Sequence, residues 1–430
     1  MATDVDVQYF SHLNGLNLGN NWGDLIRLLD KALVTGIDFT QITAASIDGQ
    51  GDVHITLYAA HNAMLFQVVE LSGFAPASLN QKYRIKGVPS ATQLILKPKT
   101  DIAERSITTT GTGKLASLGY EIIFRDTNDV KRVYRAKNPT AQHPLIRVDE
   151  SLTSPDGTTG VYTSTYAKFA MVGLLENMTH IDDYQNPSVL QLPFDPADPT
   201  KNWKITGTGA SVVRGWSRWY WARAGTTLQS IGDTTTPGTS NTSFSIVGDQ
   251  DAFYLLSSFT SQSAAGKTLK GCGLLNRANP DSVTKDWFLM TTLNQVAAST
   301  TYRFVDFSGG NPLLTSVSAS GFFMPSANQV NPIQTHRVAS PIVPDFASGY
   351  SNLYSAMNVG ALEIAVSDAD KYLRGTLKHV AYAGNKLTQT VTTPIISGGS
   401  MYIWDKSLYS NASTAESEMG GLYFYLGDIE

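Results

Sequence analysis

The segment that most constrains the fold is 212–223, which reads VVRGWSRWYWAR. Taken with a period of two, its side chains divide between two faces: Arg214, Trp216, Arg218 and Tyr220 on one, and Val213, Ser217, Trp219 and Trp221 on the other. This alternation, rich in aromatic residues, is typical of a half-buried β-strand. The segment therefore predicts a central β-sheet with a dense aromatic layer.

The face formed by Arg214, Trp216, Arg218 and Tyr220 has two interpretations. Guanidinium groups between aromatic rings can stack and make cation–π contacts, and these residue types dominate binding hot spots, so the face could contact a partner protein or a glycan. Large aromatic side chains are mostly buried, which favours packing inside the protein. If the face binds a glycan, Trp216→Ala should remove binding without unfolding the chain.

Composition favours extended β-structure. The chain has 430 residues, of which 42% are hydrophobic and 16% charged, against about 25% charged in an average protein. This length predicts two to four domains. We expect a mainly β protein of several sandwich-like or barrel-like domains with one short N-terminal helix. The expected divisions are an N-terminal arm and docking helix, a small β domain, a second β domain and a larger aromatic-rich β domain: 1–46, 47–100, 101–195 and 196–430.

Charge and hydropathy exclude two classes of partner. The net charge is −4 and no basic stripe stands out, which argues against nucleic acid. No apolar run approaches the roughly 18 residues of a membrane-spanning helix. The opening MATDVDVQYF has no apolar core, so it does not predict a secretory signal, and synthesis in a cytoplasm is expected.

One helix is expected near the N-terminus. Asn21 can act as its N-cap, Asp24 approximates a capping box, and Gly36 stands where a C-terminal glycine is favoured. Apolar residues follow at helical spacing, and those expected to dock are Leu25, Ile26, Leu29 and Leu33. This apolar face needs a partner, either the chain's own sheet or another subunit.

Short strands are expected through the rest of the chain. Segment 166–178 fits either a helix or a strand and favours a strand, because its neighbours are strands and Gly173 weakens a helix. Four prolines in 186–202 favour a domain boundary there. The other expected strands are 53–57, 65–71, 83–88, 93–97, 120–126, 131–136, 143–151, 243–256, 286–293, 301–307, 401–406 and 421–428.

Motifs that resemble nucleotide sites are incomplete. The Gly-x-Gly-x-x-Ala at 111–116 has no room for a following helix, so a turn is expected there. AGKT at 265–268 lacks the first glycine of a phosphate-binding loop, so Lys267 is expected to be a solvated loop residue. No cofactor is expected.

No metal site is expected either, because the seven histidines are scattered and His54 lies on the polar face of a strand. Cys272 is the one cysteine and is expected to be buried and inert.

Two carboxylate pairs are the remaining catalytic candidates. Asp182/Asp183 and Asp249/Asp251 could act in glycoside cleavage, which uses paired carboxylates. The alternative interpretation, which we favour, is that each pair belongs to a polar turn. We therefore expect no catalytic residues and no enzyme activity.

Several phrases resemble virion structural proteins of tailed bacteriophages. They are GFAPASLNQKYRIKGVPSATQLILK, ENMTHID, and the pair RGWSRWYWARAG and VGDQDAFYLL, at 73–97, 176–182, 214–225 and 247–256. The resemblance covers about half the chain in scattered pieces. It implies a tail- or baseplate-associated component with β-rich domains, made in a bacterial host and carried in the virion, without catalysis. Its partners would be other virion proteins and copies of itself.

Three functions follow as hypotheses. The first is a structural virion protein of the tail, baseplate or neck that works through subunit interfaces. The second is a receptor-binding protein whose aromatic face, or whose loops at 226–242 and 308–332, contact a host-surface glycan. The third is a polysaccharide depolymerase.

Overall fold

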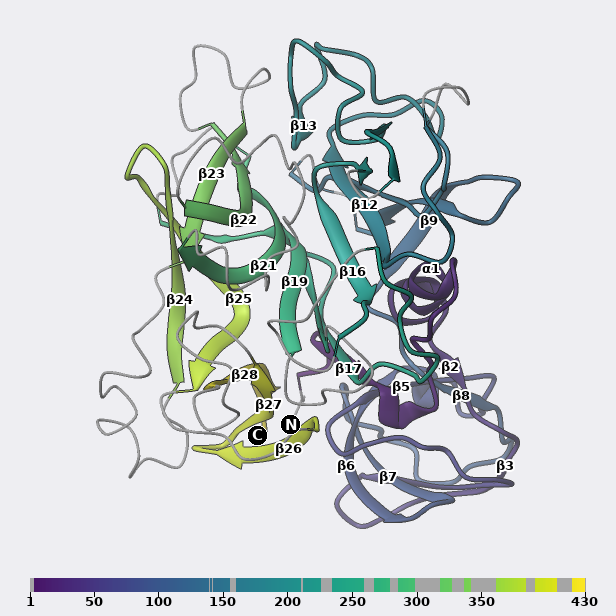
Figure 1. The fold of residues 1–430 in the computed structure, drawn as a ribbon. Helices are drawn as coiled ribbons and strands as arrows, with labels where there is room; N and C mark the ends of the chain where they lie inside the picture. Colours follow the sequence, from purple (N-terminus) through teal and green to yellow (C-terminus); the bar gives the residue numbers. More distant parts are fainter. Residues whose placement is uncertain are drawn as a thin grey trace.

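The structure is a computed structural model, and it describes residues 4–429 apart from 139, 141, 155–159, 210–211, 226–233, 259–266, 279–284, 298–317, 327–335, 342–360, 384–390 and 408–419. Its described part is mainly β, as the sequence predicts, with one short α-helix near the N-terminus. Figure 1 shows three regions: a small barrel in purple and blue, a second sheet in teal, and a large curled sheet in green and yellow.

The small barrel is a seven-stranded antiparallel sheet in the order β2-β8-β5-β6-β7-β4-β3. Segment 37–47 pairs with β8 at its start and with β4 at its end, so the sheet closes on itself. A 3-10 turn, η3 (Ala77–Leu79), precedes β6. The strands are β2 Ile37–Asp38, β3 Ile42–Ile47, β4 Val53–Leu57, β5 Val68–Ser72, β6 Lys82–Ser90, β7 Gln93–Pro98 and β8 Thr112–Leu115.

The second sheet has six strands in the described residues. Strand β12 is its centre: β11 pairs along one edge, and β13 and β16 share the other edge. Between β13 and β16 the chain forms a separate two-stranded sheet, in which β14 pairs with β15. The strands are β9 Tyr120–Arg125, β10 Lys131–Ala136, β11 Leu145–Asp149, β12 Lys168–Leu175, β13 Gln191–Leu192, β14 Ile205–Thr206, β15 Val213–Arg214 and β16 Arg218–Ala222.

The large sheet has 13 antiparallel strands in the described residues, ordered β1-β17-β18-β19-β21-β22-β23-β24-β25-β28-β27-β26, with β20 on β25. Its strands are β1 Gln8–Ser11, β17 Phe244–Gly248, β18 Ala252–Ser258, β19 Lys267–Leu274, β20 Asn276–Arg277, β21 Trp287–Ala297, β22 Ser318–Pro325, β23 His336–Pro341, β24 Ala361–Asp368, β25 Leu373–Ala383, β26 Thr393–Ser397, β27 Ser400–Ser407 and β28 Gly420–Asp428. A 3-10 turn, η1 (His12–Asn14), follows β1.

The large sheet curls until its ends meet. Lys267 on β19 donates to both carboxylate oxygens of Asp405 on β27 at 2.7 Å, and both side chains are fully buried. Ser245 on β17 donates to the same carboxylate at 3.1 Å. Burial raises the pKa of Asp405, while the charge of Lys267 lowers it. Lys267 is thus an interior cross-link, and its expected place in a solvated loop is wrong.

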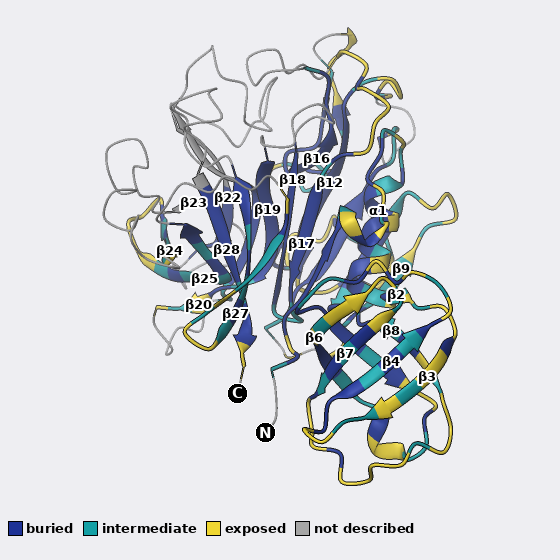
Figure 2. Cartoon of the chain, turned by 90° about the horizontal axis from the view of Figure 1, so that it is seen from below, coloured by how far each residue is buried: buried dark blue, intermediate teal, exposed yellow. Residues whose placement is uncertain are grey.

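Strands β17, β18 and β19 are buried on both faces, and β18 and β19 are dark blue in Figure 2, whereas β24 and β26 are partly exposed. On β18, Phe253 and Leu255 face the core shared with the barrel, the helix and the second sheet. Tyr254 and Leu256 face the inside of the curl. The ring of Tyr254 stacks on Phe288, with ring centroids 5.8 Å apart.

A glycine makes room for that stack. Gly271 on β19 stands directly opposite Tyr254, and a Cβ at this position would come within 2.6 Å of the Tyr254 ring. Any side chain there would displace the ring.

Sheet membership crosses the three divisions expected from the sequence. The barrel draws strands from 37–115, which spans the divisions at 46 and 100. Strand β16 completes the second sheet from beyond 195. Antiparallel pairing joins distant segments, so local composition did not indicate these boundaries.

Most expected strands are confirmed, including the strand at 166–178, whose eight residues in β12 are all buried. The expected turn at 111–116 is wrong, because Thr112–Leu115 forms β8. The strand at 301–307 lies outside the described residues, as do parts of the loop at 226–242. The expected loop at 308–332 is wrong in its described part, because Ser318–Pro325 forms β22.

The N-cap residue of the helix is Gly23 rather than Asn21. Helix α1 (Asp24–Leu29) runs directly into the π-helical turn η2 (Asp30–Thr35), and Gly36 ends it at φ 74° as expected. Asn21 keeps one predicted contact, since its N–H donates to the Asp24 carboxylate at 3.0 Å. The N-terminal N–H groups are instead capped from a distant part of the chain.

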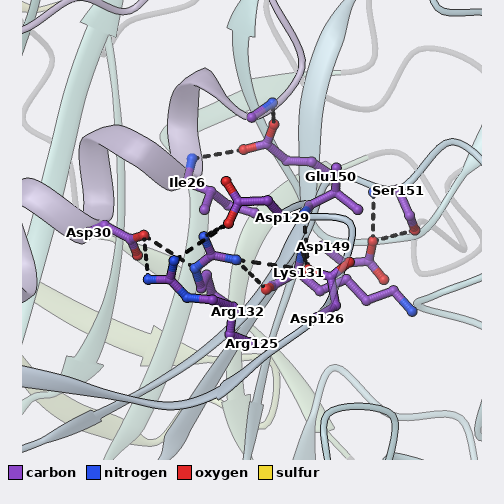
Figure 3. A network of polar contacts seen from close by, with 12 residues as sticks. Ile26, Asp30, Arg125, Asp126, Asp129, Lys131, Arg132, Asp149, Glu150 and Ser151 are labelled. Carbon is purple, nitrogen blue, oxygen red and sulfur yellow. Dashed lines mark hydrogen bonds and ion pairs between the residues drawn. The ribbon is translucent and has the colours of Figure 1, made fainter.

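That cap is the carboxylate of Glu150, which follows β11 (Figure 3). It accepts hydrogen bonds from the backbone N–H groups of Gly23 and, at 2.8 Å, of Ile26. One turn further on, Asp30 accepts from Arg132 at 3.2 Å and from the Tyr134 hydroxyl at 2.8 Å. These contacts hold the helix against the second sheet.

The apolar face of the helix is therefore covered by the chain itself. The four residues expected to dock, Leu25, Ile26, Leu29 and Leu33, have no exposed surface and belong to the main core. The sequence left two possible partners for this helix face, the chain's own sheet or another subunit, and in the structure the face packs against the chain's own sheet. These four side chains offer no surface to another subunit in this fold.

We expect stability to fall as pH rises through neutrality because of Glu150. Burial raises the pKa of Glu150 from 4.5 to about 7, against the lowering effect of its hydrogen bonds from Ile26 and Gly23. A carboxyl with a raised pKa favours the folded state below its unfolded pKa and loses this contribution as pH rises through the folded pKa. The loss should approach about 3 kcal/mol between pH 4.5 and 8.

Urea unfolding of wild type and Glu150→Gln across this pH range measures the effect. At low pH the glutamine variant should be less stable than wild type. Its free energy of unfolding should also change less with pH. Glu70→Gln, which changes a partly exposed carboxylate on the barrel, should keep the wild-type slope. An unchanged slope in Glu150→Gln would contradict the assignment.

Candidate functional site

A polar pocket of about 510 Å³ opens beyond the end of β12. Two loops line it, one leaving β12 and one preceding β14. Its residues are His180, Asp182, Asp183, Tyr184, Gln185, Thr200 and Lys204. The pocket therefore contains one of the two carboxylate pairs singled out from the sequence.

The floor of the pocket is built on Arg147 of β11. Its buried guanidinium lies over the rings of Trp203 and Tyr184, at 4.2 and 4.8 Å from their centroids. It donates to Ile181 O at 2.7 Å and to the Asp182 carboxylate at 2.6 Å. Cation–π contact and charge-assisted hydrogen bonds make this floor rigid.

Asp182 is a structural ion-pair partner. Besides Arg147, it accepts a hydrogen bond from Lys131 at 2.9 Å. Burial raises its pKa, but the Lys131 hydrogen bond and the Arg147 charge outweigh burial, and the pKa lies below its usual value. Asp182 therefore stays ionised and is poorly suited to act as a general acid.

Asp183 stabilises the loop that carries it. One of its oxygens, Oδ2, accepts from the backbone N–H and the hydroxyl of Thr179, at 2.8 and 2.9 Å. The backbone hydrogen bond is the main cause that lowers the pKa of Asp183. The favoured interpretation, a polar turn, agrees with these contacts, although the turn also borders a pocket.

The second pair, Asp249 and Asp251, lies in the turn between β17 and β18. Asp249 accepts from His379 at 2.8 Å, and Asp251 accepts from His143 at 2.8 Å and also from Lys378. Burial raises the pKa of Asp249, but the His379 hydrogen bond outweighs it; the hydrogen bond from His143 lowers that of Asp251. Asp249 is held ionised by a contact within the large sheet, and Asp251 also joins that sheet to His143, which precedes β11. Neither carboxylate can readily supply a proton.

The aromatic segment 212–223 is interior, and the expected half-exposed strand is wrong. It divides into β15 and β16, because Gly215 between them has φ 66°. Arg214, Trp216, Arg218 and Tyr220 are all buried. The packing interpretation is therefore correct, and these side chains are not available to a glycan.

The buried arginines of this segment bind backbone oxygens. Arg214 donates to Ser151 O at 2.7 Å, to Asp149 O at 2.6 Å and to Phe169 O. Arg218 donates to Arg214 O at 3.1 Å. The bond from Arg218 satisfies a carbonyl group at the break between β15 and β16, and the bonds from Arg214 satisfy carbonyl groups of β12 and at the end of β11. Buried carbonyl groups need such donors.

Two smaller expectations are confirmed. Cys272 is buried on β19, and burial raises the pKa of its thiol. His54 is partly exposed and contacts Asp48 at 3.0 Å. Within the described residues no cluster of histidine, cysteine and carboxylate side chains suits a metal ion, and no described helix combines the length and apolar character needed to span a membrane.

Sequence reasoning missed the buried charges that organise the fold: Arg84, Arg147, Glu150 and Lys267. The only signal was charge inside apolar strand patterns, as in LIRVD at 145–149. In one sequence such a charge is indistinguishable from a solvent-facing residue on an alternating strand.

The fold and pocket define a mainly β protein with a polar surface site. No protein-family model matches the chain, and no curated protein matches it. Among solved structures, the phage phi92 endosialidase is similar over 91% of this chain and 52% of its own, at 12% identity and a TM-score of 0.15. The chain thus spans about half the length of that structure, and a TM-score this low does not establish a shared fold.

Proposed function

We propose that this chain is a structural component of a tailed-bacteriophage virion, in the tail, baseplate or neck, which works through contacts with other virion proteins and with copies of itself. The proposal includes no catalysis by the chain. It rests on the phrases at 73–97, 176–182, 214–225 and 247–256 that resemble virion proteins, and on how the fold uses its charges.

The observation that carries the proposal is that interior charges join strands that are far apart in the fold. Arg84 joins the barrel to both terminal segments of the described chain, since it donates to Asp4 O, Val7 O, Phe66 O and Leu426 O. Within the large sheet, Lys267 on β19 and Asp405 on β27 join two strands that are far apart in its strand order. Such cross-links suit a body that must keep its shape within a larger assembly.

The large sheet also offers an edge for assembly. In the described residues β26 ends the sheet, and Ile396 on it is 60% exposed. Unpaired edge strands with apolar side chains can pair with a strand of another chain.

Quantitative mass spectrometry of density-purified particles, from cells that carry this gene, tests the proposal. The chain should band with the particles at a constant copy number relative to their other proteins across the gradient. Absence from the particle band, or a ratio that varies between fractions, would contradict the proposal. Turnover of a polysaccharide by the purified chain would contradict its non-catalytic part.

A further inference from the structure

We propose that the pocket beyond β12 binds a neutral saccharide, through hydroxyl contacts with His180, Asp183 and Gln185. This ligand goes beyond the structural role proposed above. The inference rests on the volume of the pocket, on the hydrogen-bonding groups it presents and on its charge.

The pocket is large enough for a small ligand and has a fixed floor. Its volume of about 510 Å³ lies within the roughly 300–1,000 Å³ of ligand sites. Arg147, held between Trp203 and Tyr184, fixes the loop that carries the lining residues through its bonds to Ile181 O and Asp182. A site that is already ordered loses less conformational entropy on binding.

The lining presents a donor and an acceptor close together in the sequence. The backbone N–H of Asp182 donates to His180 Nδ1 at 3.3 Å, which leaves the proton of the neutral ring on Nε2 as a donor. Asp183 uses Oδ2 for Thr179, so Oδ1 can accept. A sugar hydroxyl both donates and accepts, and therefore matches this pair.

Gln185 adds a further donor and acceptor. Its side chain is exposed at the pocket, and the described residues include no hydrogen-bond partner for its amide. Thr200 donates to Asp198 at 2.7 Å, so the lone pairs of its hydroxyl can accept. The pocket thus offers several groups of both kinds over a small area.

The charge of the pocket selects against ions. Lys204 pairs with Asp198, and Asp182 is neutralised by Lys131 and Arg147. Asp183 is left as a negative charge without a cationic partner in the described ion pairs, which disfavours anions such as phosphate. No described cluster suits a metal ion. A neutral polyhydroxylated molecule fits best.

The affinity should be modest. Tyr184 is 1% exposed and its ring faces Arg147, so it cannot stack on a sugar ring. Hydrogen bonds alone, made in competition with water, predict a dissociation constant on the order of 1 mM.

Saturation-transfer NMR with the full chain tests the site, using methyl α-D-glucopyranoside, methyl α-D-mannopyranoside and methyl β-D-galactopyranoside as probes. At least one glycoside should bind, and His180→Ala/Gln185→Ala should weaken it about tenfold or more. The matched control is His54→Ala/Gln50→Ala, which removes the same residue types from the barrel surface and should keep wild-type binding. Both variants change exposed or part-exposed side chains and should melt near the wild-type temperature.

Calorimetric titrations with sodium phosphate and calcium chloride complete the test. Neither should produce binding heat at the pocket. The proposal is overturned if no glycoside binds wild type, if the pocket variant binds as well as the control, or if only an ion binds. These outcomes are independent of the particle measurement, so the saccharide site and the structural role can fail separately.

Discussion

Replacing Arg84 with alanine should destabilise the chain by about 4–6 kcal/mol, the largest single effect we expect. The guanidinium is buried and donates four hydrogen bonds, to Asp4 O at 2.9 Å, Val7 O at 2.9 Å, Phe66 O at 2.7 Å and Leu426 O at 2.8 Å. Alanine would leave these carbonyl groups without a donor, and buried unpaired acceptors cost about 1–3 kcal/mol each.

The variant should also loosen both terminal segments of the described chain. Arg84 lies on the barrel, whereas Val7 precedes β1 and Leu426 belongs to β28, so one side chain joins three parts of the fold. Hydrogen exchange in β1 and β28 should therefore rise in Arg84→Ala, together with a lower urea midpoint. Arg84→Lys should recover little, because an ammonium cannot reach these divergent carbonyls as a planar guanidinium does.

Arg105→Ala is the matched control. Arg105 also lies in the barrel region and donates to a backbone carbonyl, Asp48 O at 3.0 Å, but it is exposed. Water can replace its hydrogen bond, so the variant should lose less than about 1 kcal/mol. Equal effects of Arg84→Ala and Arg105→Ala would show that Arg84 is not the cross-link described here.

Replacing Trp216 with alanine should cost about 3–5 kcal/mol and lower the melting temperature. Trp216 is 4% exposed and belongs to the main core. Its backbone N–H donates to Asn202 Oδ1 at 3.1 Å, and Lys201 lies 4.7 Å from the ring centroid. Removal of the indole would leave a cavity beneath the second sheet.

If Trp216 bound a glycan, the variant should instead lose binding and keep its fold. Thermal unfolding followed by near-ultraviolet circular dichroism distinguishes the two. Tyr58→Ala is the control, because Tyr58 is 78% exposed and its loss should change stability by less than about 0.5 kcal/mol. A Trp216→Ala variant as stable as Tyr58→Ala would show that the indole is not part of the core.

Strand positions were largely predictable, because a strand produces an alternation of side chains that is visible in a short stretch of sequence. The hairpin of β9 and β10 follows from two apolar runs around Asn128-Asp129. Strand β12 followed from its context despite a pattern that also fitted a helix. The half-exposed strand at 212–223 was wrong because other elements cover both of its faces, and alternation cannot report what packs against a face.

The candidate site was only partly visible in the sequence. Asp182 and Asp183 attracted attention as a carboxylate pair, and the structure does place both at a pocket. Their roles depend on Lys131, Arg147 and Thr179, and the contacts to Lys131 and Arg147 cross more than thirty residues of chain. Contacts between residues so far apart in the chain produce no residue spacing that can be recognised in the sequence.

The sequence by itself determined the mainly β class, the position of the short helix and the apolar faces that had to be buried, since these follow from side-chain period and turn chemistry. Only the tertiary structure decided what covers each face: the second sheet over the helix, and core on both sides of β18. It also decided the use of each buried charge, because Glu150 becomes a helix cap and Arg84 a cross-link only when folding brings remote backbone groups within hydrogen-bonding distance.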